Sequence, residues 1–207
     1  MIQSSYETKK ENIANKIIHL KKQKDVTILA HNYQIPEIQD ISDYVGDSLG
    51  LAKEASKIDS KKIIFCGVKF MAETTSILCP EKEVLIPDLD AGCSLAATIN
   101  VEQLKDWKKK NPGAVVVSYI NTTAEIKAES DYCCTSANAV KIIETIPKNK
   151  EILFLPDLFL GAYLEEKTGR RLHIWPGECH VDSKISPDLI ENLKIEKPDA
   201  ELLIHPE

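Results

Sequence analysis

A repeat with a period of about 86 residues constrains the fold of this chain most strongly. The tripeptide Ser42-Asp43-Tyr44 returns 88 positions later as Ser130-Asp131-Tyr132. Single residues also recur in matching pairs 86 positions apart, namely Tyr33 with Tyr119 and Cys93 with Cys179. A further step of 86 from Tyr119 reaches His205. Recurrence at one period predicts two complete modules of similar structure and the opening of a third.

Short apolar segments alternate with amphipathic ones along the whole chain. The apolar segments predict strands at residues 26–30, 62–66, 84–86, 114–119, 151–155, 171–174 and 200–204, with another near Tyr132. The amphipathic segments predict helices at residues 10–24, 38–58 with a break near Gly46, 71–78, 101–110 and 137–146, with a last one near Leu189. This alternation is typical of the α/β class, in which helices cover both faces of a parallel sheet.

The period and the alternation together predict the domain organisation. We expect an N-terminal helix over residues 1–25, a first α/β module over 26–112 and a second over 113–197. Residues 198–207 would form the first strand of a third module. Each module would have three layers built on a short parallel sheet, and the modules would be arranged with pseudo-threefold symmetry.

Composition and charge exclude several classes of protein. Hydrophobic residues make up 43% and charged residues 28%, the mix of an ordinary soluble globular protein. No apolar run is long enough to span a bilayer, and residues 1–25 lack the apolar core of a signal peptide, so we expect a cytoplasmic protein with no membrane partner. A net charge of -6 argues against nucleic acid as a partner.

Polar side chains follow the first strand of each expected module. His31 and Tyr33 follow the strand of module one, and Tyr119 and Asn121 that of module two. The corresponding residues of the third module are His205 and Glu207. Since ligands of α/β proteins bind at the carboxyl ends of strands, these six side chains would face one central cleft.

Two serines stand at equivalent places in the repeat, each before a helical segment. Ser48 precedes residues 49 onward and Ser136 precedes residues 137 onward, so both are candidate N-caps. Because helix N-termini gather unpaired amide hydrogens, such a pair would hold a carboxylate or phosphate in common. The alternative is that serine serves only as a preferred cap.

Two cysteines also share a phase of the repeat. Cys93 and Cys179 both lie in loops after strands. Cys93 directly follows Gly92, and Cys179 lies two positions after Gly177. Cys66, in contrast, ends an apolar strand, as a core residue would. In a reducing compartment such thiols are more often metal ligands or core residues than disulfides. Ligation of a shared metal centre by Cys93 and Cys179 is the favoured interpretation, and a structural role for each is the alternative.

Five motifs together resemble the quinolinate synthases, in order and in spacing, over nearly the whole chain. They are LAHNYQIPEIQD at residues 29–40, VGDSL at 45–49, GVKFMAET at 67–74, TSANA at 135–139 and HPE at 205–207. The resemblance implies three homologous α/β modules around a 4Fe–4S cluster that is held by one cysteine from each module. It also implies a transferase that condenses iminosuccinate with dihydroxyacetone phosphate, with loss of water and phosphate, to form quinolinate in NAD biosynthesis.

The resemblance assigns roles residue by residue. Cys93 and Cys179 would be two cluster ligands, and the third ligand is absent from this chain. Tyr33, Glu207 and His31 would be the catalytic acid–base groups. The substrate-binding residues would be His31, Ser48, Tyr119, Asn121, Ser136, His205 and Glu207. An L-aspartate oxidase or dehydrogenase would supply the iminosuccinate.

The chain departs from the family pattern in two ways. It stops at Glu207, so the third module is missing, and it has Cys179-His180-Val181-Asp182 where the family usually has Cys-x-Val-His. Three interpretations follow: a quinolinate synthase completed by further polypeptide, a cluster-free remnant without activity, and a small anion-binding α/β module. The three differ first in whether the chain binds iron.

Overall fold

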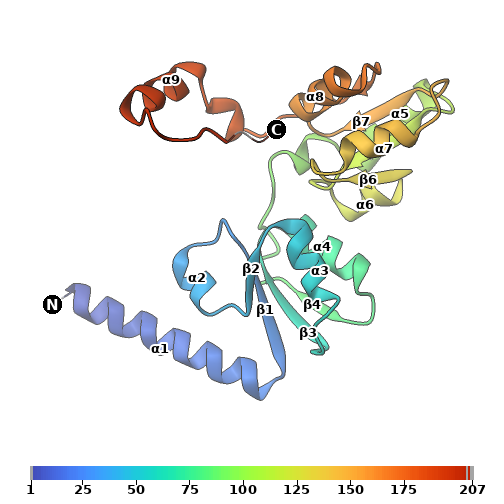
Figure 1. Cartoon of the computed structure of the whole chain (residues 1–207). Helices are drawn as coiled ribbons and strands as arrows, with labels where there is room; N and C mark the ends of the chain where they lie inside the picture. The colour runs from blue at the N-terminus through green and yellow to red at the C-terminus, as the bar shows by residue number, and fades with distance from the viewer. Residues whose placement is uncertain (1, 204, 206–207) are drawn as a thin grey trace. The chain divides into compact units, whose positions relative to one another are not determined.

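The computed structural model describes residues 2–203 and 205 and contains two compact units, residues 1–92 and 93–207. Each unit contains one four-stranded parallel sheet with helices packed on it (Figure 1). The predicted α/β class, with two modules on short parallel sheets, is therefore confirmed.

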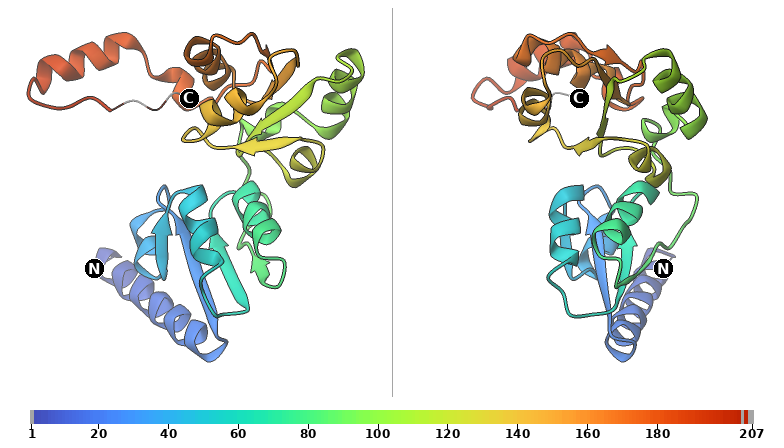
Figure 2. Two further views of the ribbon diagram at one scale, coloured as in Figure 1. Left: turned by 45° about the vertical axis from the view of Figure 1, so that its right-hand side comes forward. Right: turned by 90° about the vertical axis from the view of Figure 1, so that its right-hand side faces the viewer.

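The first unit is built from four helices and four strands in regular alternation. They are α1 (Ile2–Gln23), β1 (Val26–His31), α2 (Pro36–Asp40), β2 (Tyr44–Gly46), α3 (Ser48–Ala55), β3 (Lys62–Cys66), α4 (Lys69–Leu78) and β4 (Glu83–Leu85). The strands lie in the order β2-β1-β3-β4. Figures 1 and 2 show α1 on one side of this sheet and the paired helices α3 and α4 on the other.

The second unit repeats the same alternation and then continues. After a short 3-10 turn, η1 (Ala96–Thr98), come α5 (Val101–Lys110), β5 (Val115–Tyr119), α6 (Ala124–Ala128), β6 (Tyr132–Cys134), α7 (Ala139–Thr145), β7 (Ile152–Leu155), α8 (Leu158–Thr168) and β8 (His173–Ile174). The strand order β6-β5-β7-β8 matches that of the first unit. A second 3-10 turn, η2 (Asp182–Lys184), and helix α9 (Pro187–Glu196) follow.

The register of the strands follows the sequence repeat. Tyr44 pairs with Leu29 across β2 and β1, and Tyr132 pairs with Val117 across β6 and β5. Both partners in the second unit lie 88 positions after those in the first. Helix α5 belongs to the second unit, because its Leu104 is buried in the same core cluster as β5 and β7 residues.

The core of the second unit lies on both faces of its sheet, as the three-layer arrangement requires. Ile152 and Phe154 of β7 lie in a cluster with residues of α7 and α8, while Leu153 and Leu155 lie in a cluster with Leu104 of α5 and residues of α6. All four β7 side chains are fully buried. A strand buried on both faces needs apolar residues at every position, which explains why β7 reads as a continuous apolar run.

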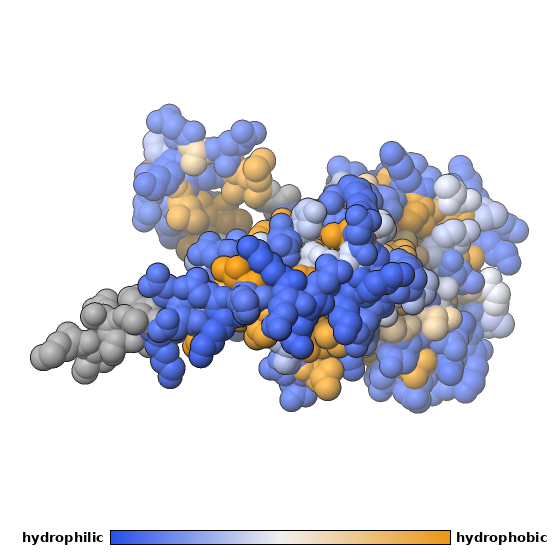
Figure 3. Space-filling view, turned by 90° about the horizontal axis from the view of Figure 1, so that it is seen from below, coloured by the Kyte–Doolittle hydropathy of each residue, from blue (hydrophilic) through white to orange (hydrophobic). Residues whose placement is uncertain are grey.

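Helix α1 has an almost wholly hydrophilic surface in the part that the space-filling view colours (Figure 3). Its two last-turn lysines, Lys21 and Lys22, complement the negative end of the helix dipole. Across the described residues, no helix combines the length and the apolar character that crossing a bilayer requires.

Two expectations about secondary structure are wrong. Residues 38–58 do not form one broken helix, because the three-residue edge strand β2 separates α2 from α3. Its side chains Tyr44 and Val45 are both exposed, so no buried alternation marked it in the sequence. The strand expected at residues 200–204 is not formed in its described part, 200–203, where no strand pairs with the segment.

Candidate functional site

The first unit presents His31 and Tyr33 at the carboxyl end of β1. His31 is the last residue of the strand and is half-buried, while Tyr33 is 87% exposed. Their rings meet edge to face with centroids 4.5 Å apart. Partial burial lowers the pKa of His31, and the carboxylate of Asp47 opposes that shift. The lowered pKa favours the neutral imidazole, which can accept a proton.

Asp47, not Ser48, caps helix α3. The Asp47 carboxylate accepts a hydrogen bond from the Gly50 amide at 2.7 Å, and Ser48 is the first residue of the helix. The expectation that Ser48 is the N-cap is therefore wrong. Asp47 and Ser48 are adjacent, and both are residue types that cap helices well. The Asp47 carboxylate accepts the hydrogen bond from the Gly50 amide, so Ser48 is the first residue of the helix instead of its cap.

In the second unit, Ser136 and His205 are brought together. The Ser136 hydroxyl lies 2.8 Å from Nε2 of His205, although the two residues are 69 positions apart. Tyr119, the last residue of β5, is buried, and Asn121 is half-buried two residues beyond the strand. These four predicted substrate-binding residues all belong to one unit.

Ser136 is not a helix N-cap either. Helix α7 begins at Ala139, and its N-cap residue is Asn138. The side-chain oxygen of Asn138 accepts a hydrogen bond from the Thr135 amide at 2.7 Å, which forms the turn in which Ser136 stands. The helix begins later than the apolar pattern indicated because this turn occupies residues 135–138.

The predicted site residues are divided between the units. His31, Tyr33 and Ser48 lie in the first, and Tyr119, Asn121, Ser136 and His205 lie in the second. Their convergence on one cavity stays a prediction. Glu207, the remaining member of the predicted set, lies outside the described residues.

The two candidate metal ligands, Cys93 and Cys179, lie in the same unit on loops that touch. Ser94, next to Cys93, is hydrogen-bonded through its hydroxyl to Nδ1 of His180, next to Cys179, at 2.6 Å. All six cysteines have free thiols. Sequence reasoning missed this pair, yet Ser94 and His180 are also 86 positions apart, so the repeat held the signal.

Thiols on touching loops suit the thiolate ligation of an iron–sulfur cluster. Both Cys93 and Cys179 are half-buried, which partly shields a bound group from water. Within residues 2–203 and 205, no group of three or more His, Cys, Asp or Glu residues is arranged to hold a metal ion. The described part of the chain therefore offers two loop thiols whose chemistry suits such a group.

The surroundings of Cys179 favour the protonated form of its thiol. Burial raises its pKa, and a hydrogen bond to the Asp182 carboxylate raises it further. Backbone amides of Val181 and Asp182 act in the opposite direction. This contact places Asp182, the residue that departs from the expected Cys-x-Val-His pattern, at the thiol.

Asp157 is a buried carboxyl group that sequence reasoning missed. It caps α8 at the end of β7, where its Oδ1 accepts from the Leu160 amide at 2.5 Å. Its Oδ2 is buried and has no hydrogen-bond partner among the described residues. Desolvation raises its pKa, with Asp182 adding to that shift and His205 opposing it. Its sequence signal is an acidic residue two positions after a buried strand.

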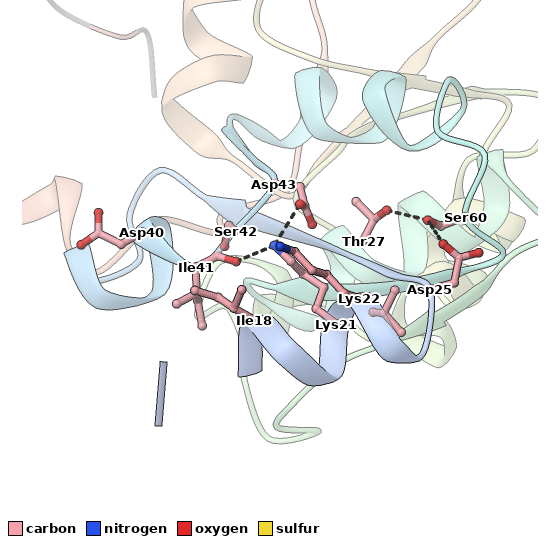
Figure 4. Close-up of a pocket in the computed structure, with 11 residues that line it drawn as sticks. Ile18, Lys21, Lys22, Asp25, Thr27, Asp40, Ile41, Ser42, Asp43 and Ser60 are labelled. Carbon is pink, nitrogen blue, oxygen red and sulfur yellow. Dashed lines mark hydrogen bonds and ion pairs between the residues drawn. The ribbon is translucent and has the colours of Figure 1, made fainter. Parts of the chain in front are cut away.

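Two surface cavities lie away from these residues. One, of about 400 Å³, opens at the amino end of β1, where Lys21 Nζ bonds the Asp43 carboxylate at 2.9 Å and the Ile41 carbonyl (Figure 4). The other, of about 720 Å³, surrounds Arg170, whose guanidinium donates to four backbone carbonyls. None of the predicted site residues lines either cavity, so neither cavity is the predicted site.

Comparison with known proteins identifies the family. The family model for quinolinate synthetase A protein matches residues 15–207. The chain is 53% identical to the quinolinate synthase of Pyrobaculum aerophilum over 94% of its own length, and 52% identical to that of Thermus thermophilus over 95%. It is 54% identical over 95% of its length to the quinolinate synthase of a Mycobacterium species, strain KMS.

The chain belongs to the quinolinate synthase family. The resemblance noted in the motifs is thereby confirmed. The matched region covers 64% of the Pyrobaculum and Thermus quinolinate synthases and 59% of the Mycobacterium one. The chain thus spans about three fifths of the length of these relatives.

Proposed function

We propose that this chain acts in quinolinate synthesis, condensing iminosuccinate with dihydroxyacetone phosphate to give quinolinate, phosphate and water. Membership of the quinolinate synthase family over nearly the whole chain carries this proposal. The reaction is that of a transferase in NAD biosynthesis. An L-aspartate oxidase or dehydrogenase would supply the iminosuccinate, and the free thiols suit a reducing cytoplasm.

The proposed cofactor is a 4Fe–4S cluster. Cys93 and Cys179 would provide two thiolates, and a third would come from outside these 207 residues. The contact between their loops supports this assignment, because it keeps both thiols in one part of the second unit. When bound through three thiolates, the cluster supplies an iron without a protein ligand, which acts as a Lewis acid toward a substrate oxygen.

Proton transfer is assigned to residues at the end of β1 and to Glu207. The lowered pKa of His31 supports a neutral imidazole that takes a proton from a substrate carbon or nitrogen. Tyr33 stands in ring contact with His31 and is exposed, so its hydroxyl is accessible to a substrate. Glu207 is the third proposed acid–base group.

Substrate binding is assigned mainly to the second unit. The Ser136–His205 pair offers a hydroxyl and an imidazole side by side, which suits the phosphate or a carboxylate of a substrate. Ser48, in the first turn of α3, would contribute a second hydroxyl. Tyr119 and Asn121 would orient the bound substrate from the carboxyl end of β5.

The test is anaerobic reconstitution with iron and sulfide, with and without a supplied third module. The C-terminal third of the Thermus thermophilus relative would be added as a separate polypeptide or fused after Glu207. We expect the 207 residues alone to bind little iron and form little quinolinate, because two thiolates leave the remaining irons open to solvent. Adding the C-terminal third should raise both the iron content and the formation of quinolinate.

Cysteine variants decide between the three interpretations. In the completed protein, Cys93→Ser should abolish bound iron and quinolinate, while Cys133→Ser, at an exposed cysteine on β6, should leave both unchanged. A completed protein that binds no iron would support the cluster-free remnant. One that binds substrate anions without iron would support the anion-binding module.

A further inference from the structure

The loops that carry Cys93 and Cys179 are joined at two separate places. At the first, the Ser94 hydroxyl and Nδ1 of His180 lie 2.6 Å apart. At the second, the Trp175 indole donates to the Thr98 carbonyl at 3.2 Å. The segments 93–98 and 175–180 therefore lie against one another along their length, with one cysteine in each.

The second junction depends on a glycine. A Cβ atom at Gly177 would overlap the Pro156 carbonyl oxygen and the Thr98 hydroxyl oxygen. The Gly177 carbonyl also accepts a hydrogen bond from the Leu158 amide at 2.8 Å, at the start of α8. The base of the Cys179 loop is thus fixed against the sheet, and only the outer end remains to be positioned.

The first junction fixes that outer end. Ser94 and His180 are both exposed, and each is the immediate neighbour of a candidate ligand. A single exposed hydrogen bond contributes little to the stability of a whole unit. It does restrict two neighbouring loop ends to one arrangement, so its effect falls on the separation of the two thiols.

We propose that Ser94 and His180 are positioning residues that hold the Cys93 and Cys179 thiols together before any iron is bound. This inference rests on the proposed function, in which both cysteines ligate the cluster. Preorganised ligands bind a metal centre more tightly, because the loops have already been ordered in the folded chain. Neither Ser94 nor His180 needs to touch the cluster to act in this way.

The first experiment measures the separation of the thiols in the iron-free chain. The folded 207-residue protein is treated with a limiting amount of a short bifunctional maleimide, and the Cys93–Cys179 cross-link is quantified by peptide mass spectrometry. The rate for Ser94→Ala and for His180→Ala should fall about three- to tenfold, the loss expected of one hydrogen bond. Ser94→Thr keeps the hydroxyl and should stay near the original rate.

The controls separate positioning from folding. His19→Ala removes an exposed histidine from α1 in the first unit and should leave the cross-linking rate unchanged. The double variant Ser94→Ala/His180→Ala should be no slower than either single variant, since both remove the same bond. Thermal unfolding midpoints of all variants should agree within about 5 °C, the largest shift expected for loss of one hydrogen bond in a chain of this size.

A second measurement, in the protein completed with the relative's C-terminal third, links the contact to the cofactor. Iron retained after gel filtration should fall in His180→Ala and in Ser94→Ala, and should stay near the original level in Ser94→Thr. An unchanged cross-linking rate in His180→Ala overturns the inference, as does a lower rate with undiminished iron retention. If cross-linking depends on His180 but the completed protein takes up no iron, the positioning of the thiols stands and the proposed function fails.

Discussion

Two aspartates, 88 residues apart, make equivalent hydrogen bonds in the two units. Asp43 accepts a hydrogen bond from the Ile28 amide of β1 at 2.8 Å, and Asp131 accepts one from the Val116 amide of β5 at 2.8 Å. In both units the aspartate amide also donates to the carbonyl of that strand residue. The recurring Ser-Asp-Tyr tripeptide thus joins the edge strand to the first strand of each sheet, and its recurrence has a structural cause.

Removing one of these carboxylates should destabilise its unit. Asp131→Ala leaves the Val116 amide without its side-chain acceptor at a fully buried residue, so we expect a loss of about 1–3 kcal/mol in the free energy of unfolding. Urea denaturation of the full chain measures it. Asp106→Ala, on the exposed face of α5, should leave stability nearly unchanged. Equal effects of the two substitutions would contradict the assignment.

Asp157 should make stability depend on pH in an unusual direction. Desolvation raises its pKa in the folded chain above the ordinary value of about 3.9. A raised pKa means that the folded state binds this proton more tightly than the unfolded state does. Its contribution to stability is therefore fully present below about pH 3.9 and is lost as the pH rises through the raised pKa.

The substitution Asp157→Asn tests this sign. Asparagine keeps an oxygen acceptor for the Leu160 amide and cannot ionise, so the variant should gain stability relative to the original chain as the pH rises from 4 to 8. Unfolding free energies at matched pH values measure the difference. Asp106→Asn should show the opposite trend, because Lys109 lowers the pKa of Asp106. A difference for Asp157→Asn that does not change with pH would show that the carboxyl is not perturbed.

At the scale of the elements, the close packing of α8 against β8 determines how a substitution at Gly161 changes stability. Glycine inside a helix costs up to about 1 kcal/mol relative to alanine, so Gly161→Ala would ordinarily stabilise α8. A Cβ atom at this position, however, would lie 2.6 Å from Cγ2 of Ile174 on β8. Overpacking of this kind costs about 1–3 kcal/mol, which exceeds the gain in helix propensity.

We therefore expect Gly161→Ala to lower the unfolding free energy by up to about 2 kcal/mol, the difference between the two effects. Shortening the opposing side chain should remove the clash, so Gly161→Ala in an Ile174→Ala background should be neutral or stabilising. A double-mutant cycle by urea denaturation measures this coupling. Additive effects of the two substitutions would show that the helix and β8 do not meet as described.

The elements most easily predicted from sequence are those with a strong local signal. The β7 run Ile152–Leu155 and helix Val101–Lys110 match the prediction closely, because long apolar or periodic signals identify them. Strand β2 was missed since its three residues are held by pairing with β1 and not by burial. Pairing depends on a partner distant in sequence, which a local pattern does not contain.

The candidate site was predictable to a similar degree. Residues at strand ends, such as His31 and Tyr119, follow from topology alone, because parallel strands present their carboxyl ends at one edge. The cap at Asp47 instead of Ser48 depends on which of two adjacent side chains reaches the Gly50 amide. The repeat relates Ser94 to His180, 86 positions later, but their contact also depends on loop conformations that local propensity does not specify.

At the scale of the whole molecule, helix α9 stands apart from the other elements. It has no buried residue, and its Leu189 and Leu193 side chains are each half exposed. A ten-residue helix that buries nothing has little tertiary packing to stabilise it, although the Ser186 hydroxyl caps it at the Leu189 amide. The Pyrobaculum and Thermus relatives are longer than the region that matches this chain, which covers 64% of each, and an apolar helix face is suited to packing against such further sequence.

Hydrogen exchange measured by mass spectrometry should report this difference directly. In the 207-residue chain, amides of α9 should exchange much faster than those of α8, whose Leu160 and Leu164 are fully buried. Adding the C-terminal third of the Thermus thermophilus relative should slow exchange in α9 and leave α8 unchanged. In that mixture, Leu193→Asp should restore fast exchange in α9, because a carboxylate on the apolar face opposes burial. Exchange in α9 as slow as in α8 before anything is added would show that the helix is already packed within this chain.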